Sequence, residues 1–447
     1  MSISQSRQAF RGRAAVAVVA ISTFALLLTG CSVSSSAKSD QVTITVQDVV
    51  DQKAVMDVIV PAFEKANPGI TVKIQTISND QKATTNAQVI TGSNPPDVAF
   101  VPIGTTPYIT ALKVNALVPL TDVWANQKLD SRYPASTAAF AKASDGTPYV
   151  VATDNILYGI AFYNKDLFAT AGINAPADHR IATNADLYSI AAKLTAIGVD
   201  PLGVNGKDVF SAGWMTDGLL PTATTPAQLL NYSTSYNPDV KVTEKYTDAP
   251  FTKVLQQLSD WQTHGVFQAG FLGQDLTTTQ AQFEQGRTGM FLGANVSVAA
   301  LSQGSVKYDW LLLPPVEGST TKVQMPSYQG DSWGIPANSK NIAAAKKFLE
   351  FLVSDEMQVN AFGNNGVFPI VNTVPTSELK GVDPITLELI DDSNKNGTPT
   401  GWTSAVPGPV GQLVVGTSMQ SVWSGQMTVQ QAAQAQQDAL TKARAGN

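Results

Sequence analysis

An alternation of strand-like and helix-like segments is the feature that most restricts the fold of this 447-residue chain. The segment "QVTITV" (41–46) places valine and isoleucine at every second position, and "GITVKI" (69–74) repeats that pattern. A helical pattern over 53–66 lies between them, although Pro61 predicts a kink or a late start. A short apolar strand follows at 98–101. Strands separated by helices favour parallel βαβ units and an α/β fold.

The later helices carry clearer start and stop signals. In "TNADLYSIAAKLTAIG" (183–198), Thr183 can cap the helix together with Asp186, and the final glycine ends it. The segment 338–354 repeats apolar residues at helical spacing, and 428–444 is rich in alanine and glutamine with a modest apolar face. These patterns predict helices within 183–198, 338–354 and 428–444.

The N-terminus has the form of an export signal. Three arginines precede an apolar stretch over 14–28, which is shorter than the roughly 20 residues of a membrane span. The segment "LTGC" (28–31) then resembles a bacterial lipobox, in which the cysteine becomes the first residue and carries a lipid. Cys31 is the only cysteine of the chain, and 32–40 is a polar tether. We therefore expect a cleaved signal peptide over 1–30 and a lipid anchor on Cys31.

Removal of residues 1–30 would leave 417 residues, too many for one hydrophobic core, so two lobes are expected. It would also remove three of the 29 basic residues and none of the 35 acidic ones. An acidic exported chain is a poor match to a nucleic-acid-binding protein, which needs basic surface. With its only cysteine committed to the lipid, the chain has no thiol for a disulfide, a zinc site or catalysis.

Enzyme motifs are scarce in this sequence. Its two histidines, His179 and His264, belong to no HExxH motif and no clustered ligand spacing, so we expect no metal site. There is no GxSxG segment and no P-loop, and we expect no cofactor. A glycoside hydrolase needs only two facing carboxylates, so that alternative stays open. Few lysines and arginines, with many Trp, Tyr, Asn and Gln residues near glycine-rich turns, suit a neutral polyhydroxyl ligand.

The segment "DGTPYVVATDNILYGIAFYNKDLFATAGI" (145–173) resembles the extracellular solute-binding proteins of ABC importers, in their carbohydrate-binding family 1. Further segments resemble that family in the same order along the chain: 63–74, 92–101, 115–124, 283–296, "LLLPP", "GDSWGIPANSKNIAAAKKFLEFLVSDEMQ" and 364–370. The sequence departs from the family pattern at Asn295, where a tryptophan is frequent, at Phe162, and in "IATNADLYSI" (181–190). These departures weaken the transfer of any particular sugar's contacts.

The resemblance implies an α/β, two-lobe, periplasmic-binding-protein-like (type II) fold with a hinge and an interlobe cleft. The chain is expected to cross between lobes near 152–156, 315–328 and 368–374. The first lobe would contain 41–152 and 318–368, and the second 153–317 and 369–447.

The same layout selects candidate ligand-binding residues, because ligands of such sheets lie beyond the carboxyl ends of the strands. Some of these candidates end the first strand, and others lie at or just after the first two crossings. Asn295 ends the strand that contains Gly293, and the remaining candidates offer an aromatic ring. The candidates are Gln47, Asp48, Asp154, Asn155, Trp214, Asn295, Asp331, Trp333 and Trp402.

The expected mechanism is capture by hinge closure, because a ligand stabilises the form that contacts it from both lobes. The resemblance implies delivery to a membrane permease driven by a separate ATPase, by a monomer anchored at the outer face of the cell membrane. A polyamine remains an alternative ligand, since carboxylates and aromatic rings also bind cations. A structural lipoprotein or a chemoreceptor co-ligand is a third alternative.

Overall fold

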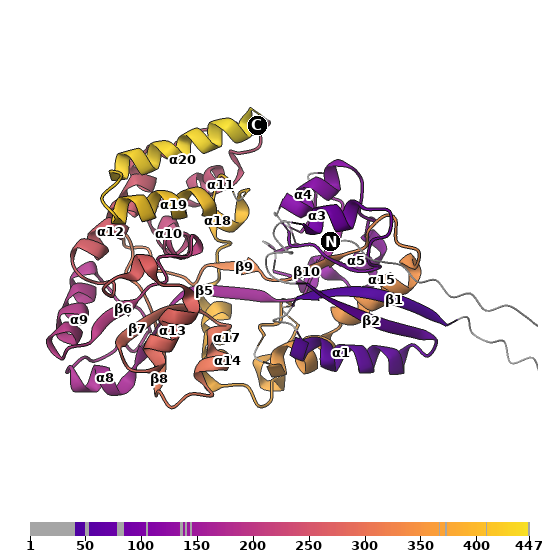
Figure 1. Cartoon of the computed structure of the whole chain (residues 1–447), viewed down its shortest axis with the longest axis horizontal. Helices are drawn as coiled ribbons and strands as arrows, with labels where there is room; N and C mark the ends of the chain where they lie inside the picture. Colours follow the sequence, from indigo (N-terminus) through magenta and orange to yellow (C-terminus); the bar gives the residue numbers. More distant parts are fainter. Residues whose placement is uncertain are drawn as a thin grey trace, which may run out of the picture. The chain divides into compact units, whose positions relative to one another are not determined.

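The computed structural model describes residues 41–445, except 50–52, 78–84, 104–105, 135–136, 139–140, 144, 366, 372 and 408 (Figure 1). Residues 41–447 form one compact unit. The expected signal peptide, Cys31 and its tether all lie outside the described residues. Within the described part of the chain, no helix combines the length and the apolar character needed to cross a bilayer.

The predicted strand–helix–strand unit at the start of the chain is confirmed. Strand β1 (Val42–Val49) pairs in parallel with β2 (Ile70–Ile77), and helix α1 (Lys53–Ala66) connects them. In Figure 1, α1 runs along the two indigo strands. One face of α1 is buried, whereas Pro61 lies on its exposed face within a continuous helix, so the predicted late start was wrong.

A second, three-stranded sheet belongs to the same lobe and is assembled from distant segments. Strand β10 (Ser332–Gly334) lies between β3 (Ala99–Phe100) and β4 (Val150–Ala152), antiparallel to both. The surrounding helices and turns are α3 (Asn86–Thr91), α4 (Thr106–Lys113), α5 (Thr121–Asn126), α6 (Leu129–Arg132), α15 (Ile342–Leu352), α16 (Asp355–Met357), η3 (Gln358–Phe362) and η4 (Gly363–Asn365). We call this assembly the first lobe.

The second lobe is built on a larger mixed sheet with the strand order β6-β7-β5-β8. Strands β6 (Asp200–Gly203) and β7 (Thr288–Ala294) are parallel, while the long β5 (Asn155–Asn164) is antiparallel to β7 and β8 (Tyr308–Leu312). Strand β9 (Ser327–Gln329) pairs with the first residues of β5. The start of β5 and the end of β7 therefore lie at the same edge of the sheet.

Helices cover this sheet and supply most of the second lobe's core. They are α8 (Lys165–Thr170), α9 (Asn184–Ala196), α10 (Phe210–Ala223), α11 (Pro226–Thr234), α12 (Ala249–Thr263), η2 (Phe271–Gly273), α13 (Leu276–Glu284), α14 (Ser297–Leu301), η5 (Thr376–Glu378), α17 (Pro384–Asn396), α18 (Trp402–Ala405), α19 (Gln412–Trp423) and α20 (Val429–Arg444). Helices α19 and α20, yellow in Figure 1, pack side by side. The predicted capping box of Thr183 and Asp186 is present at the start of α9.

Packing defines the lobe boundaries differently from the expected ones at two places. Val323 and Met325 pack with Leu157 in a cluster of the second lobe, so the first lobe's second segment begins after β9 and not at residue 318. Conversely, Ile370 and Val371 pack into the first lobe's core, beyond the expected boundary at 368. Both differences arise because apolar side chains beside a crossing pack against whichever core is nearer.

Candidate functional site

The three chain crossings are hydrogen-bonded to one another at residues 153–155, which we call the hinge clasp. The Thr153 N–H donates to the Asp331 carbonyl oxygen at 3.1 Å, and the Asn155 N–H donates to the Phe368 carbonyl oxygen at 3.0 Å. Asp154 forms an isolated bridge with Pro369. Every crossing is thus tied to the same three residues, so the predicted hinge candidates Asp154, Asn155 and Asp331 do lie together.

The Asp154 carboxylate has a fixed position within the hinge clasp. It is 1% exposed and accepts a hydrogen bond from the Asp331 N–H, while the Asp154 carbonyl accepts one from Gly330 at 3.0 Å. A Cβ atom on Gly330 would lie 2.6 Å from both carboxylate oxygens. Glycine is therefore required at 330 for the second crossing to approach this carboxylate.

Asn295 extends the pairing of β7 with β5 beyond the end of β7. Its backbone N–H donates to the Leu157 carbonyl at 2.8 Å, and its Oδ1 accepts from the Leu157 N–H at 3.1 Å. The amide Nδ2 donates to the Asn155 carbonyl at 3.4 Å. The side chain is fully buried and positions the start of β5, whereas the next residue, Val296, is 48% exposed.

Four aromatic residues lie next to the hinge clasp on the second lobe, and we call them the aromatic cluster: Tyr158, Phe210, Trp214 and Tyr328. The Trp214 ring lies 5.6 Å from Tyr158 and 4.8 Å from Phe210, and Tyr158 lies 5.4 Å from Tyr328. Phe210 and Tyr328 are partly exposed, and Trp214 is 8% exposed. Partly exposed rings beside a hinge can stack against the C–H faces of a sugar.

A β-bulge and a buried carboxylate hold the aromatic cluster in place. The pairing of β5 with β7 shifts register between Tyr158 and Ile160, and the intervening Gly159 has φ +70°, a backbone conformation that favours glycine. The Tyr158 hydroxyl donates to Asp217 of α10 at 2.7 Å. Asp217 also accepts hydrogen bonds from the hydroxyl and the N–H of Thr403.

Burial dominates the electrostatics of this network. It raises the pKa of Asp217 to about 6, although the hydrogen bonds from Thr403 and Tyr158 act in the opposite direction. Burial, followed by the nearby Asp217 charge, also raises the pKa of Tyr158 well above its usual value. The tyrosine therefore stays protonated and donates its hydrogen bond at any physiological pH.

On the first lobe, Gln47 and Trp333 belong to the interior. Gln47 is fully buried: its Oε1 accepts from the Phe100 N–H at 3.2 Å, and its carbonyl accepts from Trp333 Nε1 at 2.9 Å. The Trp333 ring has no exposed surface and packs edge-on against Phe100. Asp48, the following residue, lines a groove of about 490 Å³ between β1, β2 and α1.

Trp402 also lies in a core, in contrast to the surface loop that its glycine- and proline-rich surroundings predict. It begins the short helix α18, is 1% exposed, and donates its indole N–H to the Tyr246 hydroxyl at 3.0 Å. Both Trp333 and Trp402 are thus occupied by packing, which leaves Trp214 as the tryptophan best placed to meet a ligand. The sequence reasoning missed Tyr158, Phe210, Tyr328 and Asp217. The glycine after Tyr158 and the glycine after β9 were local signals of a bulge and a turn.

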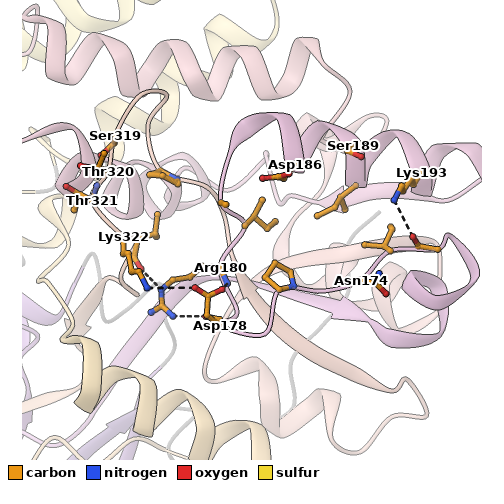
Figure 2. Close-up of a pocket in the computed structure, with 18 residues that line it drawn as sticks. Asn174, Asp178, Arg180, Asp186, Ser189, Lys193, Ser319, Thr320, Thr321 and Lys322 are labelled. Carbon is orange, nitrogen blue, oxygen red and sulfur yellow. Dashed lines mark hydrogen bonds and ion pairs between the residues drawn. The ribbon is translucent and has the colours of Figure 1, made fainter.

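Of the other pockets in the described part of the chain, two bear on the choice of site. Figure 2 shows a groove of about 610 Å³ between Asp186, Ser189 and Lys193 of α9, the loop containing Asp178 and Arg180, and residues 319–323; none of the nine predicted site residues lines it. A smaller pocket of about 370 Å³ lies beside the third crossing and includes Asn155. The larger groove is thus separate from the hinge candidates, and we favour the hinge because all three crossings and the aromatic cluster meet there.

The chain belongs to the bacterial extracellular solute-binding protein family, whose sequence model matches residues 47–359. Among curated relatives, it is 27% identical over 358 residues to a protein of Brucella abortus named as a binding protein. That alignment covers 77% of this chain and 80% of the relative. It is 24% identical over 412 residues to a maltooligosaccharide ABC transporter solute-binding lipoprotein of Streptococcus pneumoniae, with 86% of each chain covered.

Solved structures share the fold at low sequence identity. A chitin oligosaccharide binding protein superposes with a TM-score of 0.75 at 20% identity, covering 91% of this chain and all of that one. A solute-binding protein in complex with raffinose superposes with a TM-score of 0.69 at 19% identity, covering 90% of this chain and all of that one. The expected two-lobe α/β fold is thereby confirmed.

Proposed function

We propose that this protein is a lipid-anchored, extracytoplasmic solute-binding protein that captures a sugar or oligosaccharide by hinge closure and delivers it to an ABC importer. The observation that carries the proposal is the hinge clasp at 153–155 with the aromatic cluster beside it. A ligand bound there would contact both lobes only in a closed form, and would therefore stabilise closure.

Three further lines support a carbohydrate ligand. Family membership gives the class of protein, and the relative from Streptococcus pneumoniae is named for maltooligosaccharides. Trp214, Phe210 and Tyr328 offer aromatic surface for the C–H faces of a sugar ring. Asp48 and Asn155 each line a pocket and can hydrogen-bond to its hydroxyl groups, whereas the buried Asp154 carboxylate orients the crossing through Asp331.

The anchor and the partner belong to the same proposal. The lipobox-like segment at 28–31 would attach the binder to the outer face of the cell membrane through Cys31. Tethering raises its effective concentration at the permease, while a separate ATPase supplies the energy. We further propose that the protein is a monomer, and that it releases its ligand chemically unchanged.

Tryptophan fluorescence of residues 41–447 tests the proposal, because this range forms a compact unit of its own. The panel contains mono- and oligosaccharides together with putrescine and spermidine. We expect saturable binding of one sugar class with a dissociation constant in the micromolar range or tighter, about −8 kcal/mol or stronger. Trp214→Phe should weaken that binding several-fold, by about 1 kcal/mol.

Trp423→Phe is the matched control, because Trp423 lies in the second lobe's core and donates its indole N–H to the Leu258 carbonyl. Its dissociation constant should equal that of the unsubstituted protein. A response to polyamines alone would replace the sugar by a cation and keep the fold. Hydrolysis of a glycoside by the purified protein would favour a glycoside hydrolase. Silence across the panel, without thermal stabilisation, would contradict the proposed ligand class.

A further inference from the structure

We propose that His179, Asp309 and Glu388 form a binding site for a divalent transition-metal ion such as Zn²⁺ on the second lobe. The three residues come from the loop before α9, from β8 and from α17. One donor atom of each lies within 4.8 Å of the other two, the one such group of three among the described residues. Imidazole nitrogen with carboxylate oxygens is a donor set that Zn²⁺ accepts.

The histidine is held in one orientation. Its ring stacks on the indole of Trp310 with centroids 4.1 Å apart and planes 3° from parallel. Its Nδ1 donates to the Trp310 carbonyl oxygen at 2.9 Å, so Nε2 is the unprotonated nitrogen that can bind a metal ion. This hydrogen bond fixes the tautomer of the ring, as the second ring nitrogen of a metal-binding histidine commonly does by donating to a carbonyl oxygen.

The two carboxylates are also oriented by Trp310. Asp309 Oδ1 accepts from the Trp310 backbone N–H at 2.9 Å, and Glu388 Oε2 accepts from the indole Nε1 at 3.3 Å. One tryptophan thus positions all three candidate ligands, as hydrogen-bonding neighbours do in protein metal sites. Glu388 is exposed, so its side chain can complete the site by a small rotation.

A neighbouring ion pair fixes the loop of His179 against α17. Arg180 donates to both carboxylate oxygens of Asp392, at 3.0 Å and 2.8 Å. Asp392 lies one helical turn after Glu388, so both carboxylates are on the face of α17 that meets the loop. Figure 2 shows Arg180 with Asp178 at the wall of the adjacent groove. The backbone framework of the proposed site is thus present without the ion.

Lys165 is the competing cation. Its Nζ lies 3.2 Å from Asp309 Oδ2, and its side chain is 51% exposed. An ion bound at Asp309 has to displace this ammonium group or share the carboxylate with it. Replacement of Lys165 by a neutral residue should consequently strengthen metal binding, which is an outcome that incidental surface binding would not give.

Isothermal titration of residues 41–447 with ZnCl₂ tests the site. We expect one saturable site, at least about tenfold weaker in His179→Asn and several-fold tighter in Lys165→Gln. Asparagine is chosen because His179 has φ +57°, a conformation that asparagine tolerates. Thermal unfolding without metal verifies that each variant is folded.

His264→Asn is the matched control. The His264 ring also stacks on an aromatic ring, that of Tyr188, at 4.1 Å and 8°, and its Nδ1 lies 2.8 Å from the Asp260 carbonyl. Unlike His179, it belongs to no group of three candidate ligands in the described part of the chain. Its substitution should leave the affinity unchanged. Equal weakening by both histidine substitutions, or no saturable binding at all, would overturn the proposal.

Discussion

The buried carboxyl of Asp217 should make the stability of this protein fall as the pH rises from about 4 to about 6. Its pKa is raised by burial from 3.8 to about 6 in the folded protein. The folded state therefore holds the proton over a range in which the unfolded chain has released it. A raised pKa contributes stability below the unfolded value, and that contribution is lost as the pH passes through the folded value.

The size of the effect follows from the width of that interval. It spans about two pH units, and each unit corresponds to about 1.36 kcal/mol, so ionised Asp217 should lower the free energy of unfolding by about 3 kcal/mol at pH 7. Asp217 is 1% exposed, so solvent does not screen it. Asp217→Asn keeps the shape of the side chain and removes its titration.

Urea unfolding of both proteins from pH 3.5 to pH 8 measures the effect. The difference between the Asn variant and the unsubstituted protein should grow in favour of the variant by about 2.5 kcal/mol between pH 4 and pH 7, because part of the effect is already present at pH 4. Any loss from altered hydrogen bonds to Thr403 is the same at every pH and cancels in this comparison. A constant difference across the range, or a change in the opposite direction, would refute the argument that burial outweighs the hydrogen bonds.

Substitutions of glycine and of a buried arginine give further tests by urea or thermal unfolding. Gly401→Ala should lower the free energy of unfolding by about 3 kcal/mol or more, because the added Cβ would overlap the Tyr158 hydroxyl and the Asp217 carboxyl. Gly218→Ala should raise it by about 0.5–1 kcal/mol, because Gly218 lies in α10 with free space around the added methyl group. Arg132→Met should cost about 3 kcal/mol, because it leaves the buried Val353 carbonyl without the guanidinium that donates to it at 2.7 Å. Gly330→Ala should weaken ligand binding in the fluorescence titration, because the added Cβ would displace the carboxylate of the hinge clasp; unchanged affinity would contradict a role of that carboxylate in closure.

Local signals in the sequence predicted the elements that depend on near neighbours. The capping box of Thr183 and Asp186 and the two strands around α1 are encoded within a few residues, and the structure contains them. The alternation of these elements also predicted the α/β class. The family resemblance supplied the order of the crossings, from which it followed that Asp154 and Asp331 would lie at the hinge.

Burial could not be read from the same signals. Trp402 lies among glycine and proline residues, which predict an exposed loop, yet its indole is enclosed by Tyr246 and Phe251 from segments about 150 residues earlier. Trp333 is likewise buried by distant segments: it lies in the first lobe's core because β10 is the central strand between β3 and β4. A ring's availability to a ligand depends on tertiary neighbours that composition does not specify.

The same limit explains why clusters of distant residues escaped the sequence. His179 has no ligand spacing in the chain, because its partners Asp309 and Glu388 follow 130 and 209 residues later and reach it only through β8 and α17. The absence of a metal motif in sequence therefore excludes sites built within one segment and says nothing about sites built across three. Asp217 and Tyr158 illustrate the same point, since a carboxyl in the middle of an apolar helix is recognisable as an anomaly, whereas its partner is not. Anomalous polar residues inside apolar segments are accordingly the positions at which a sequence most usefully directs attention to long-range contacts.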